Sequence, residues 1–270
     1  MPSVAVLDIG SNSIKILVVE RAANGELKAL LSETIEARIS QGINQANPSL
    51  SDEAMRRGLG AIRELIALSI PYDPIQTQLV ATSAVRDANN SAAFQQVVFE
   101  ATGHRIKVLS GTEEANLIGQ GITCDPALTD LHDFQLFDLG GGSMECLSFK
   151  DRHLQRAESL QLGCVRLTEK FITDRTAPLG ANELQSIYDF SAQTLQDREW
   201  PCSPVATTAL EARQSIRGLP PARADVFPTA LTTLLAVAVH GGFSAYHHSL
   251  FNLRYGVVAE MLDVITDSSG

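Results

Sequence analysis

Two stretches of the chain share one pattern of apolar and polar residues. Residues 4–19 begin with an apolar run that ends in Asp8, continue through a glycine-containing turn that ends in serine, and finish with a second apolar run. Residues 134–149 repeat this order around Asp138. Apolar runs of this length, bounded by glycine-rich turns, are typical of β-strands. The sequence therefore predicts two similar β-hairpins, about half a chain apart.

The rest of the chain alternates between helical and strand patterns. Ser51 can cap a helix whose apolar residues recur at helical spacing up to Ile66. Further helices are predicted near residues 91–102, 164–172, 182–198, 227–240 and 257–265, and one begins after Ser110. Strands are predicted near residues 78–81, 106–108, 154–162, 203–207 and 248–252. This alternation indicates an α/β fold with two lobes of similar plan, which we place at residues 1–122 and 123–270 around a central cleft.

The charge balance limits the partners that the protein can bind. The chain has 21 Lys and Arg against 31 Asp and Glu, which gives a net charge of −10. Both halves are acidic, with a charge of −7 in residues 1–150 and −3 in residues 151–270. Without a basic region there is no electrostatic attraction for DNA, RNA or an anionic membrane, and we expect none of them as a partner. A polyanionic ligand would need a local site of backbone amides, a few arginines and metal ions.

The N-terminal sequence and the cysteine spacing bear on where the protein is located. No basic stretch precedes the first apolar run, and Asp8 interrupts that run, so no signal peptide is predicted. The four cysteines show no CxxC spacing, which is typical of reduced thiols. We therefore expect a cytoplasmic protein.

The two glycine-containing turns have a definite chemical use. Glycine lets the backbone approach a ligand closely, and successive amide N–H groups can point into one concavity that binds phosphate oxygens. Asp8 and Asp138, at the strand ends, could hold Mg²⁺ directly or through its waters, because this ion prefers oxygen ligands. A single turn of this kind is more simply an ordinary hairpin turn with Asp as a turn former. Because two matched turns occur, we favour a phosphate clamp.

Two further polar clusters could supply a catalytic base and a cation. Glu113 and Glu114 start a predicted helix, where acids also stabilise the helix dipole by about 0.3–1 kcal/mol. A carboxylate there could instead orient and deprotonate a water molecule. Arg86 follows a predicted strand and could bind a phosphate or pair with its neighbours. The residues alone leave these alternatives open.

Five motifs occur in order along the first two thirds of the chain. They span residues 8–13, 82–88, 110–115, 138–143 and 162–167, and they read DIGSNS, TSAVRDA, SGTEEA, DLGGGS and LGCVRL. Together they resemble the exopolyphosphatase/guanosine pentaphosphate phosphohydrolase family, over residue 4 to about residue 170. That family has the fold of actin, sugar kinases and heat-shock-chaperone ATPases, in which two ribonuclease-H-like lobes surround a cleft. The resemblance implies this fold, in its short two-domain form.

The resemblance also implies an activity and a role for each motif residue. It implies Mg²⁺-dependent removal of the terminal phosphate from inorganic polyphosphate, or of the 5′ γ-phosphate from guanosine pentaphosphate. Glu114 matches the catalytic base that activates water, and Asp138 and Glu145 match acids that hold metal and water, so Glu145 counts as catalytic too. Asp8 matches the acid that opens the first loop and is taken as a metal ligand, and Arg86 matches an arginine that contacts polyphosphate. The implied phosphate loops are Gly10, Ser11, Asn12 and Ser13, and Gly140, Gly141, Gly142 and Ser143.

Three segments depart from the family pattern. Residues Ala206–Ala209 lack a usual glycine, Thr229 replaces a glycine after proline, and Tyr255 replaces a glutamate. These departures leave open whether activity is weakened, which of the two substrates is used, and which chain length is preferred. A phosphate-binding regulator without turnover is the alternative from another class, and an ATP-driven kinase or chaperone is a weaker one. The sequence also leaves open whether the protein forms a homodimer.

Overall fold

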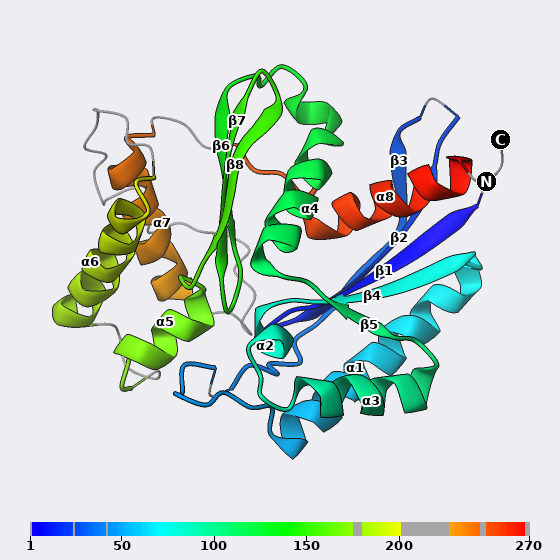
Figure 1. Ribbon diagram of the computed structural model, residues 1–270, viewed down its shortest axis with the longest axis horizontal. Coiled ribbons are helices and arrows are strands. Elements are labelled where there is room, and N and C mark those ends of the chain that lie inside the picture. Colours follow the sequence, from blue (N-terminus) through cyan, green and yellow to red (C-terminus); the bar gives the residue numbers. More distant parts are fainter. Residues whose placement is uncertain are drawn as a thin grey trace.

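Two β-sheets of different size carry the fold, and helix α4 (Gly111–Thr123) lies between them (Figure 1). The computed structural model describes residues 2–23, 25–41, 43–174, 180–200, 227–243 and 247–267. Within these ranges, no helix has both the length and the apolar character needed to cross a membrane.

The first sheet has five strands in the order β3-β2-β1-β4-β5. Its strands are β1 (Ser3–Ile9), β2 (Ile14–Arg21), β3 (Leu27–Ile35), β4 (Gln76–Ala81) and β5 (Ile106–Val108). Strand β2 pairs antiparallel with β1 and with β3, whereas β4 pairs in parallel with β1 and with β5. The structure confirms the hairpin predicted at residues 4–19.

Helices cover both faces of this sheet, which explains why β1 reads as an almost continuous apolar run. Leu7 and its alternate neighbours pack against α1 (Asp52–Ser69) and α3 (Ser91–Thr102), whereas Val6 faces α4 and α8 (Leu253–Asp267). Short helix α2 (Ser83–Arg86) follows β4, and 3₁₀ turns η1 and η2 span Ile70–Tyr72 and Pro126–Leu128.

The predicted helix starts are confirmed at the two serine caps. The Ser51 side chain accepts a hydrogen bond from Ala54 N (3.1 Å) at the start of α1. Ser110 and Glu113 form a capping box at the start of α4.

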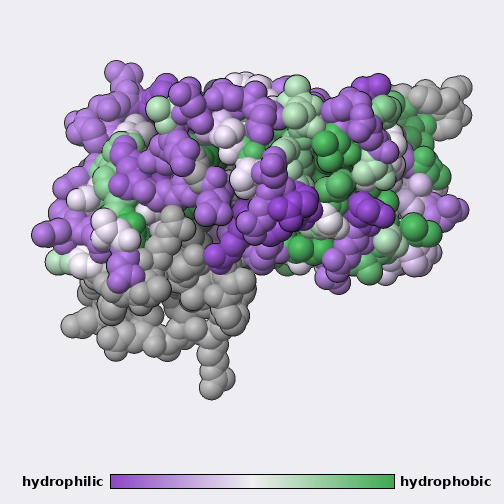
Figure 2. Space-filling view, turned by 90° about the horizontal axis from the view of Figure 1, so that it is seen from below, coloured by the Kyte–Doolittle hydropathy of each residue, from purple (hydrophilic) through white to green (hydrophobic). Residues whose placement is uncertain are grey.

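Seen from below, hydrophobic side chains are scattered over the side that carries α1 and α3, and hydrophilic ones dominate the described part of the other side (Figure 2).

The second sheet has three antiparallel strands in the order β6-β7-β8. They are β6 (Phe134–Leu139), β7 (Met144–Lys150) and β8 (His153–Leu160). One face packs against α5 (Cys164–Phe171), α6 (Ala181–Asp197) and α7 (Phe227–Gly241), and the other faces α4. The second predicted hairpin is therefore also confirmed.

Three predictions differ from the structure or fall outside it. Residues 248–252 do not form the predicted strand, because Phe251 packs its ring against Tyr255 of α8 (ring centroids 4.0 Å apart) instead of pairing with a sheet. The strand predicted at 203–207 lies outside the described residues. Helix α8 begins at Leu253 and packs on β1 of the first sheet, although it follows residue 122 in sequence. The division into residues 1–122 and 123–270 remains a prediction.

Candidate active site

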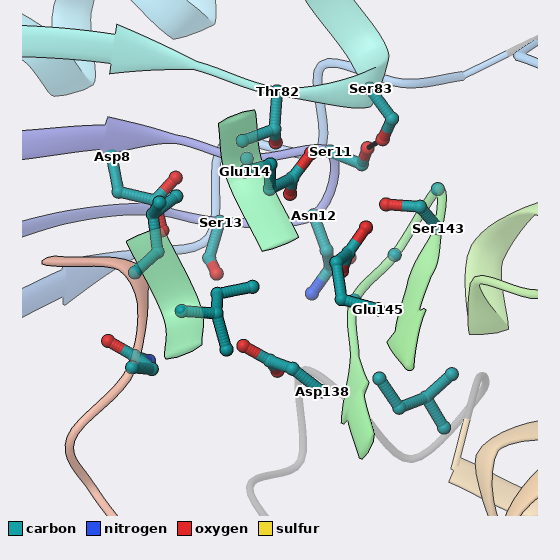
Figure 3. A pocket seen from close by; sticks show the side chains of 18 of the residues that line it. Asp8, Ser11, Asn12, Ser13, Thr82, Ser83, Glu114, Asp138, Ser143 and Glu145 are labelled. Carbon is teal, nitrogen blue, oxygen red and sulfur yellow. Dashed lines mark hydrogen bonds between the residues drawn. The ribbon is translucent and has the colours of Figure 1, made fainter. Parts of the chain in front are cut away.

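The two glycine-containing turns are closed by equivalent backbone hydrogen bonds and line the same pocket. Gly10 N donates to Ser13 O (3.1 Å), and Gly140 N donates to Ser143 O (2.9 Å). The pocket has a volume of about 120 Å³, and residues of both turns face it (Figure 3). The structure thus brings together all eight predicted loop residues: Gly10, Ser11, Asn12, Ser13, Gly140, Gly141, Gly142 and Ser143.

Glycine is required where the turns approach each other. A Cβ at Gly142 would overlap Ser83 Oγ and lie 2.7 Å from Ser11 Oγ. A Cβ at Gly163, which caps α5, would overlap the backbone of the second turn. The hydroxyls of Ser11 and Ser83 are themselves 2.9 Å apart and hydrogen-bonded. The absence of side chains at these glycines therefore sets how closely the two sheets' turns can pack.

Four carboxylates surround the pocket, and each comes from a different element. Asp8 is the next-to-last residue of β1 and Asp138 that of β6, Glu145 lies on β7, and Glu114 lies in the first turn of α4 (Figure 3). The two hairpins place them in equivalent register: Asp8 pairs with Lys15, and Asp138 pairs with Glu145. The second hairpin therefore has an acid where the first has a lysine.

Burial and mutual repulsion disfavour the charged form of three of these carboxylates. Burial raises the pKa of Glu114 to about 7, against the opposing effect of Arg86 and with a contribution from Asp8 and Asp138. Burial also raises the pKa of Asp138, although Lys15 counteracts it. The pKa of Glu145 lies well above its usual range, first because of burial and then because of the neighbouring acids. A bound cation would relieve this repulsion.

Arg86 contacts a carboxylate rather than the floor of the pocket. Its Nη1 donates to Glu114 Oε2 (2.7 Å) and to Leu109 O (3.0 Å). The residue sits at the end of α2 and lines a neighbouring cavity. The predicted role of Arg86 as a phosphate contact remains a prediction, and its observed contact orients Glu114.

Several pocket residues were not predicted from the sequence. Lys15, Thr82, Ser83 and Asn252 also line the pocket. Lys15 carried a signal, because it is a charged residue inside an apolar strand and lies 4.0 Å from Asp8. Asn252 reaches the pocket through the packing of α8 on the first sheet.

Thr229 and Tyr255, two positions that depart from the family pattern, lie in the core rather than at the pocket. Thr229 is fully buried and hydrogen-bonds to Thr168 (2.8 Å). Tyr255 belongs to the core cluster between α4 and α8. Residues 206–209 lie outside the described residues. Neither Thr229 nor Tyr255 therefore lines the pocket where the four carboxylates meet.

A model of the Ppx/GppA phosphatase family matches residues 18–204, which is more than half of the chain. The chain belongs to the Ppx/GppA phosphatase family. This confirms the family predicted from the five motifs and, with it, a hydrolase that acts on phosphoanhydrides.

Solved structures of this family share the fold. An exopolyphosphatase from Cytophaga hutchinsonii is 20% identical with a TM-score of 0.82, and the match covers 97% of this chain and 98% of that one. The Ppx/GppA family member of Aquifex aeolicus is also 20% identical, with a TM-score of 0.73 and coverage of 97% and 98%. These matches confirm the predicted two-lobed α/β fold over nearly the whole chain.

Proposed function

We propose that this family member is an exopolyphosphatase that releases terminal phosphate from inorganic polyphosphate. One observation carries the proposal: two matched glycine-serine turns and the carboxylate of Glu114 face a single polar pocket. The turns offer backbone amides and serine hydroxyls to the phosphates. Phosphoryl transfer depends mainly on such positioning and on charge neutralisation.

We also propose Mg²⁺ as the cofactor, and the donor chemistry fits it. Asp8, Asp138 and Glu145 offer only oxygen ligands, and the pKa values of Asp138 and Glu145 are raised first by burial, with a further contribution from neighbouring acids. Among the described residues, no three His, Cys, Asp or Glu side chains converge into a direct metal cage. Mg²⁺ usually keeps several waters and takes one or two carboxylates plus substrate phosphates, so this arrangement suits it. When bound, the ion neutralises phosphate charge.

In this proposal the protein's own residues perform the remaining steps. The turns hold the terminal phosphate, and Glu114 orients a water molecule and takes its proton as the water oxygen attacks phosphorus. The bond from that phosphorus to the bridging oxygen breaks, which releases inorganic phosphate and a chain one unit shorter. Arg86 holds Glu114 Oε2, and this leaves Oε1 for the water.

Phosphate release from polyphosphate, with and without Mg²⁺, tests the proposal. We expect Glu114→Gln to lower kcat by about 10²–10⁴-fold, because glutamine cannot accept the proton. Glu113→Gln is the matched control, since that side chain caps α4 and pairs with Lys107 (3.8 Å) without lining the pocket, so its replacement should leave kcat nearly unchanged. Equal activity of wild type and Glu114→Gln would exclude Glu114 as the base.

Guanosine pentaphosphate is the alternative substrate for the same site. Adding it as a competitor to the polyphosphate assay distinguishes the two: faster turnover of the nucleotide at equal concentration would overturn our choice. Tight polyphosphate binding without any turnover would instead indicate a regulatory binder.

A further inference from the structure

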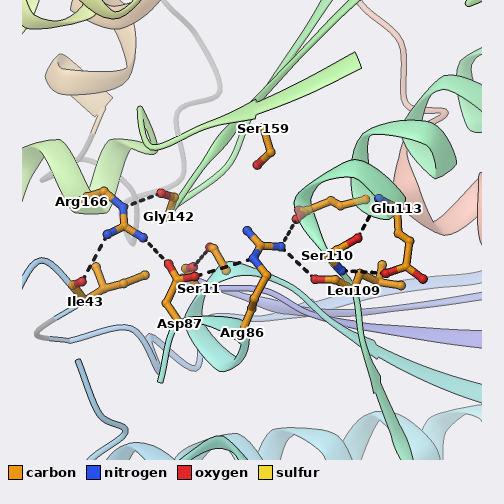
Figure 4. Close-up of polar contacts among 12 residues, drawn as sticks. Ser11, Ile43, Arg86, Asp87, Leu109, Ser110, Glu113, Gly142, Ser159 and Arg166 are labelled. Atoms are coloured by element: carbon orange, nitrogen blue, oxygen red, sulfur yellow. Dashed lines mark hydrogen bonds and ion pairs between the residues drawn. The ribbon is translucent and has the colours of Figure 1, made fainter. Parts of the chain in front are cut away.

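Charged side chains of alternating sign link the second lobe to Glu114. Arg166 of α5 donates from Nη2 to Asp87 Oδ2 (2.6 Å). Asp87 Oδ1 in turn lies 3.7 Å from Nε of the preceding residue, Arg86, so that the two arginines lie on opposite sides of Asp87 (Figure 4). Arg86 donates from Nη1 to Glu114 Oε2 (2.7 Å). Cations and anions thus alternate along one path, and their formal charges cancel.

Arg166 is the member of this path that crosses between the lobes. It also donates from Nε to Gly142 O (2.8 Å) in the second glycine-containing turn, and from Nη1 to Ile43 O (3.3 Å) in the segment after β3 (Figure 4). Only 8% of its side chain is exposed. Among the described residues, Asp87 is the only carboxylate paired with this cation. Loss of either partner would therefore leave a charge uncompensated in a poorly solvated place.

Asp87 lies within reach of both arginines but is bonded to only one. The 2.6 Å contact with Arg166 is a charge-assisted hydrogen bond, whereas 3.7 Å to Arg86 Nε is too long for any hydrogen bond. As long as Arg166 neutralises Asp87, Arg86 has little reason to turn toward it. Without Arg166, Asp87 would draw Arg86, the nearest remaining cation, away from Glu114.

The short helix α2 couples these two contacts. Arg86 is its last residue, and Asp87 follows directly, with its backbone N–H donating to Ser83 O (2.9 Å). Consecutive residues cannot move independently, so a shift of Asp87 also moves Arg86. Within the described part of the chain, the Arg86 guanidinium is the only side-chain hydrogen-bond donor to Glu114, whose side chain is 7% exposed. The orientation of Glu114 therefore depends on where Arg86 lies.

We propose that Arg166 and Asp87 are positioning residues for the catalytic base: Arg166 holds Asp87 away from Arg86, and Arg86 therefore stays on Glu114. The inference rests on the proposed function, in which Glu114 takes the proton of the attacking water. Because Arg166 also binds Gly142 O, it links the orientation of the base to the contact between the two lobes.

Three variants test whether the charge of Arg166 acts through Asp87. We expect Arg166→Gln to lower kcat for polyphosphate by about 10–100-fold, because a misplaced Arg86 no longer orients Glu114. Adding Asp87→Asn to Arg166→Gln should recover kcat to within about threefold of wild type, because no anion then competes for Arg86. Arg166→Lys should recover it as well, because lysine keeps the charge. Any change in KM from the weakened bond to Gly142 O should be the same with and without Asp87→Asn.

Arg152→Gln is the matched control. Arg152 likewise donates to backbone carbonyls, those of Leu128 and Leu131, but it has no carboxylate partner among the described residues and lines neither cavity, so its replacement should leave kcat unchanged. A double variant as slow as Arg166→Gln would overturn the inference and leave Arg166 a purely structural role. Should Arg166→Gln fail to fold, the double variant and Arg166→Lys decide, since a tenfold loss of kcat in either one overturns the proposal.

Urea unfolding separates this inference from the proposed function. In the wild type, Asp87→Asn should lower the urea midpoint, because it leaves the buried Arg166 without its anion. In the Arg166→Gln background it should raise the midpoint, because two acids no longer share Arg86. A shift in the same direction in both backgrounds overturns the inference, even for a protein without turnover. A wild type that releases no phosphate from polyphosphate overturns only the proposed function.

Discussion

Two adjacent glutamates at the start of α4 lie in opposite surroundings. Glu113 is about half exposed and accepts a hydrogen bond from Ser110 N (2.9 Å), which holds its pKa below the usual range. Glu114, one residue on, is buried, and its pKa is raised to about 7. The hundred-degree step between neighbouring helical positions thus turns one carboxylate toward solvent and the next into the pocket.

We predict that Glu114→Gln stabilises the metal-free protein and that the gain grows with pH. The folded-state pKa of Glu114 lies above its ordinary value of 4.5, so its contribution to the unfolding free energy is full below that value and is lost as pH rises through 7. The side-chain oxygen of a glutamine at position 114 can still accept a hydrogen bond from Arg86, but glutamine does not ionise. Between about pH 5 and about pH 8, the gain should grow by about 2–3 kcal/mol. Urea unfolding in EDTA measures it.

Glu113→Gln is the control for this measurement. Because the pKa of Glu113 is lowered in the folded state, its stabilising effect is lost as pH falls, and its replacement should shift stability in the opposite direction. A gain for Glu114→Gln that stays constant with pH would contradict the assigned burial effect.

Much of the candidate site could be predicted from the sequence, because many of the pocket residues lie close together along the chain. Each turn, with the aspartate before it, is encoded in six consecutive residues, and both turns line the pocket. The choice of Glu114 over Glu113 came only from the family resemblance, since both glutamates suit a helix start. The contact of Arg86 with Glu114 spans 28 positions and depends on the packing of α2 beside α4. No local pattern encodes it.

At the scale of elements, α4 and α8 pack so closely that their backbones are in contact. A Cβ at Gly256 would overlap Leu117 O of α4, and one at Gly121 would overlap Asn252 O at the start of α8. Helix α4 carries Glu114, and Asn252 lines the same pocket. The two glycines therefore set the position of both pocket segments.

We predict that Gly256→Ala destabilises the protein by about 1–3 kcal/mol and lowers kcat, because α4 must move to admit the methyl group. Gly60→Ala in α1 is the matched control: open space surrounds that position, so alanine should stabilise by about 0.5–1 kcal/mol and leave kcat unchanged. Urea unfolding and phosphate release measure both effects. Similar stability changes at the two glycines would rule out the close helix contact.

Element types were easier to predict than element partners. The helix patterns at residues 91–102 and 164–172 correspond closely to α3 and α5, because periodicity reports which face is buried. Periodicity does not report what covers that face. Trp200, for example, follows α6 and is only 2% exposed, because it packs into the second lobe's core beside Phe137. The docking of α8 on the first sheet was missed for the same reason.

At the scale of the whole molecule, the site exists only where the two sheets meet. The first sheet supplies Asp8, the second supplies Asp138 and Glu145, and α4 between them supplies Glu114. Packing of the two turns brings these acids together, and the raised pKa values of Glu114, Asp138 and Glu145 reflect first the cost of burial and then the repulsion between neighbouring acids. A cation at this junction would therefore stabilise the contact between the lobes as well as the substrate.

We predict that Mg²⁺ raises the melting temperature of the substrate-free protein above neutral pH, where more of these acids are ionised. At a hundredfold excess over its Kd, the ion should add about 2.7 kcal/mol, or about 5–10 °C. Asp138→Asn should lose most of this gain, since it removes an anionic ligand. Asp133→Asn, an exposed acid just before β6, should keep it. Scanning calorimetry with and without Mg²⁺ measures the shifts, and an equal gain in both variants would place the ion elsewhere on this acidic chain.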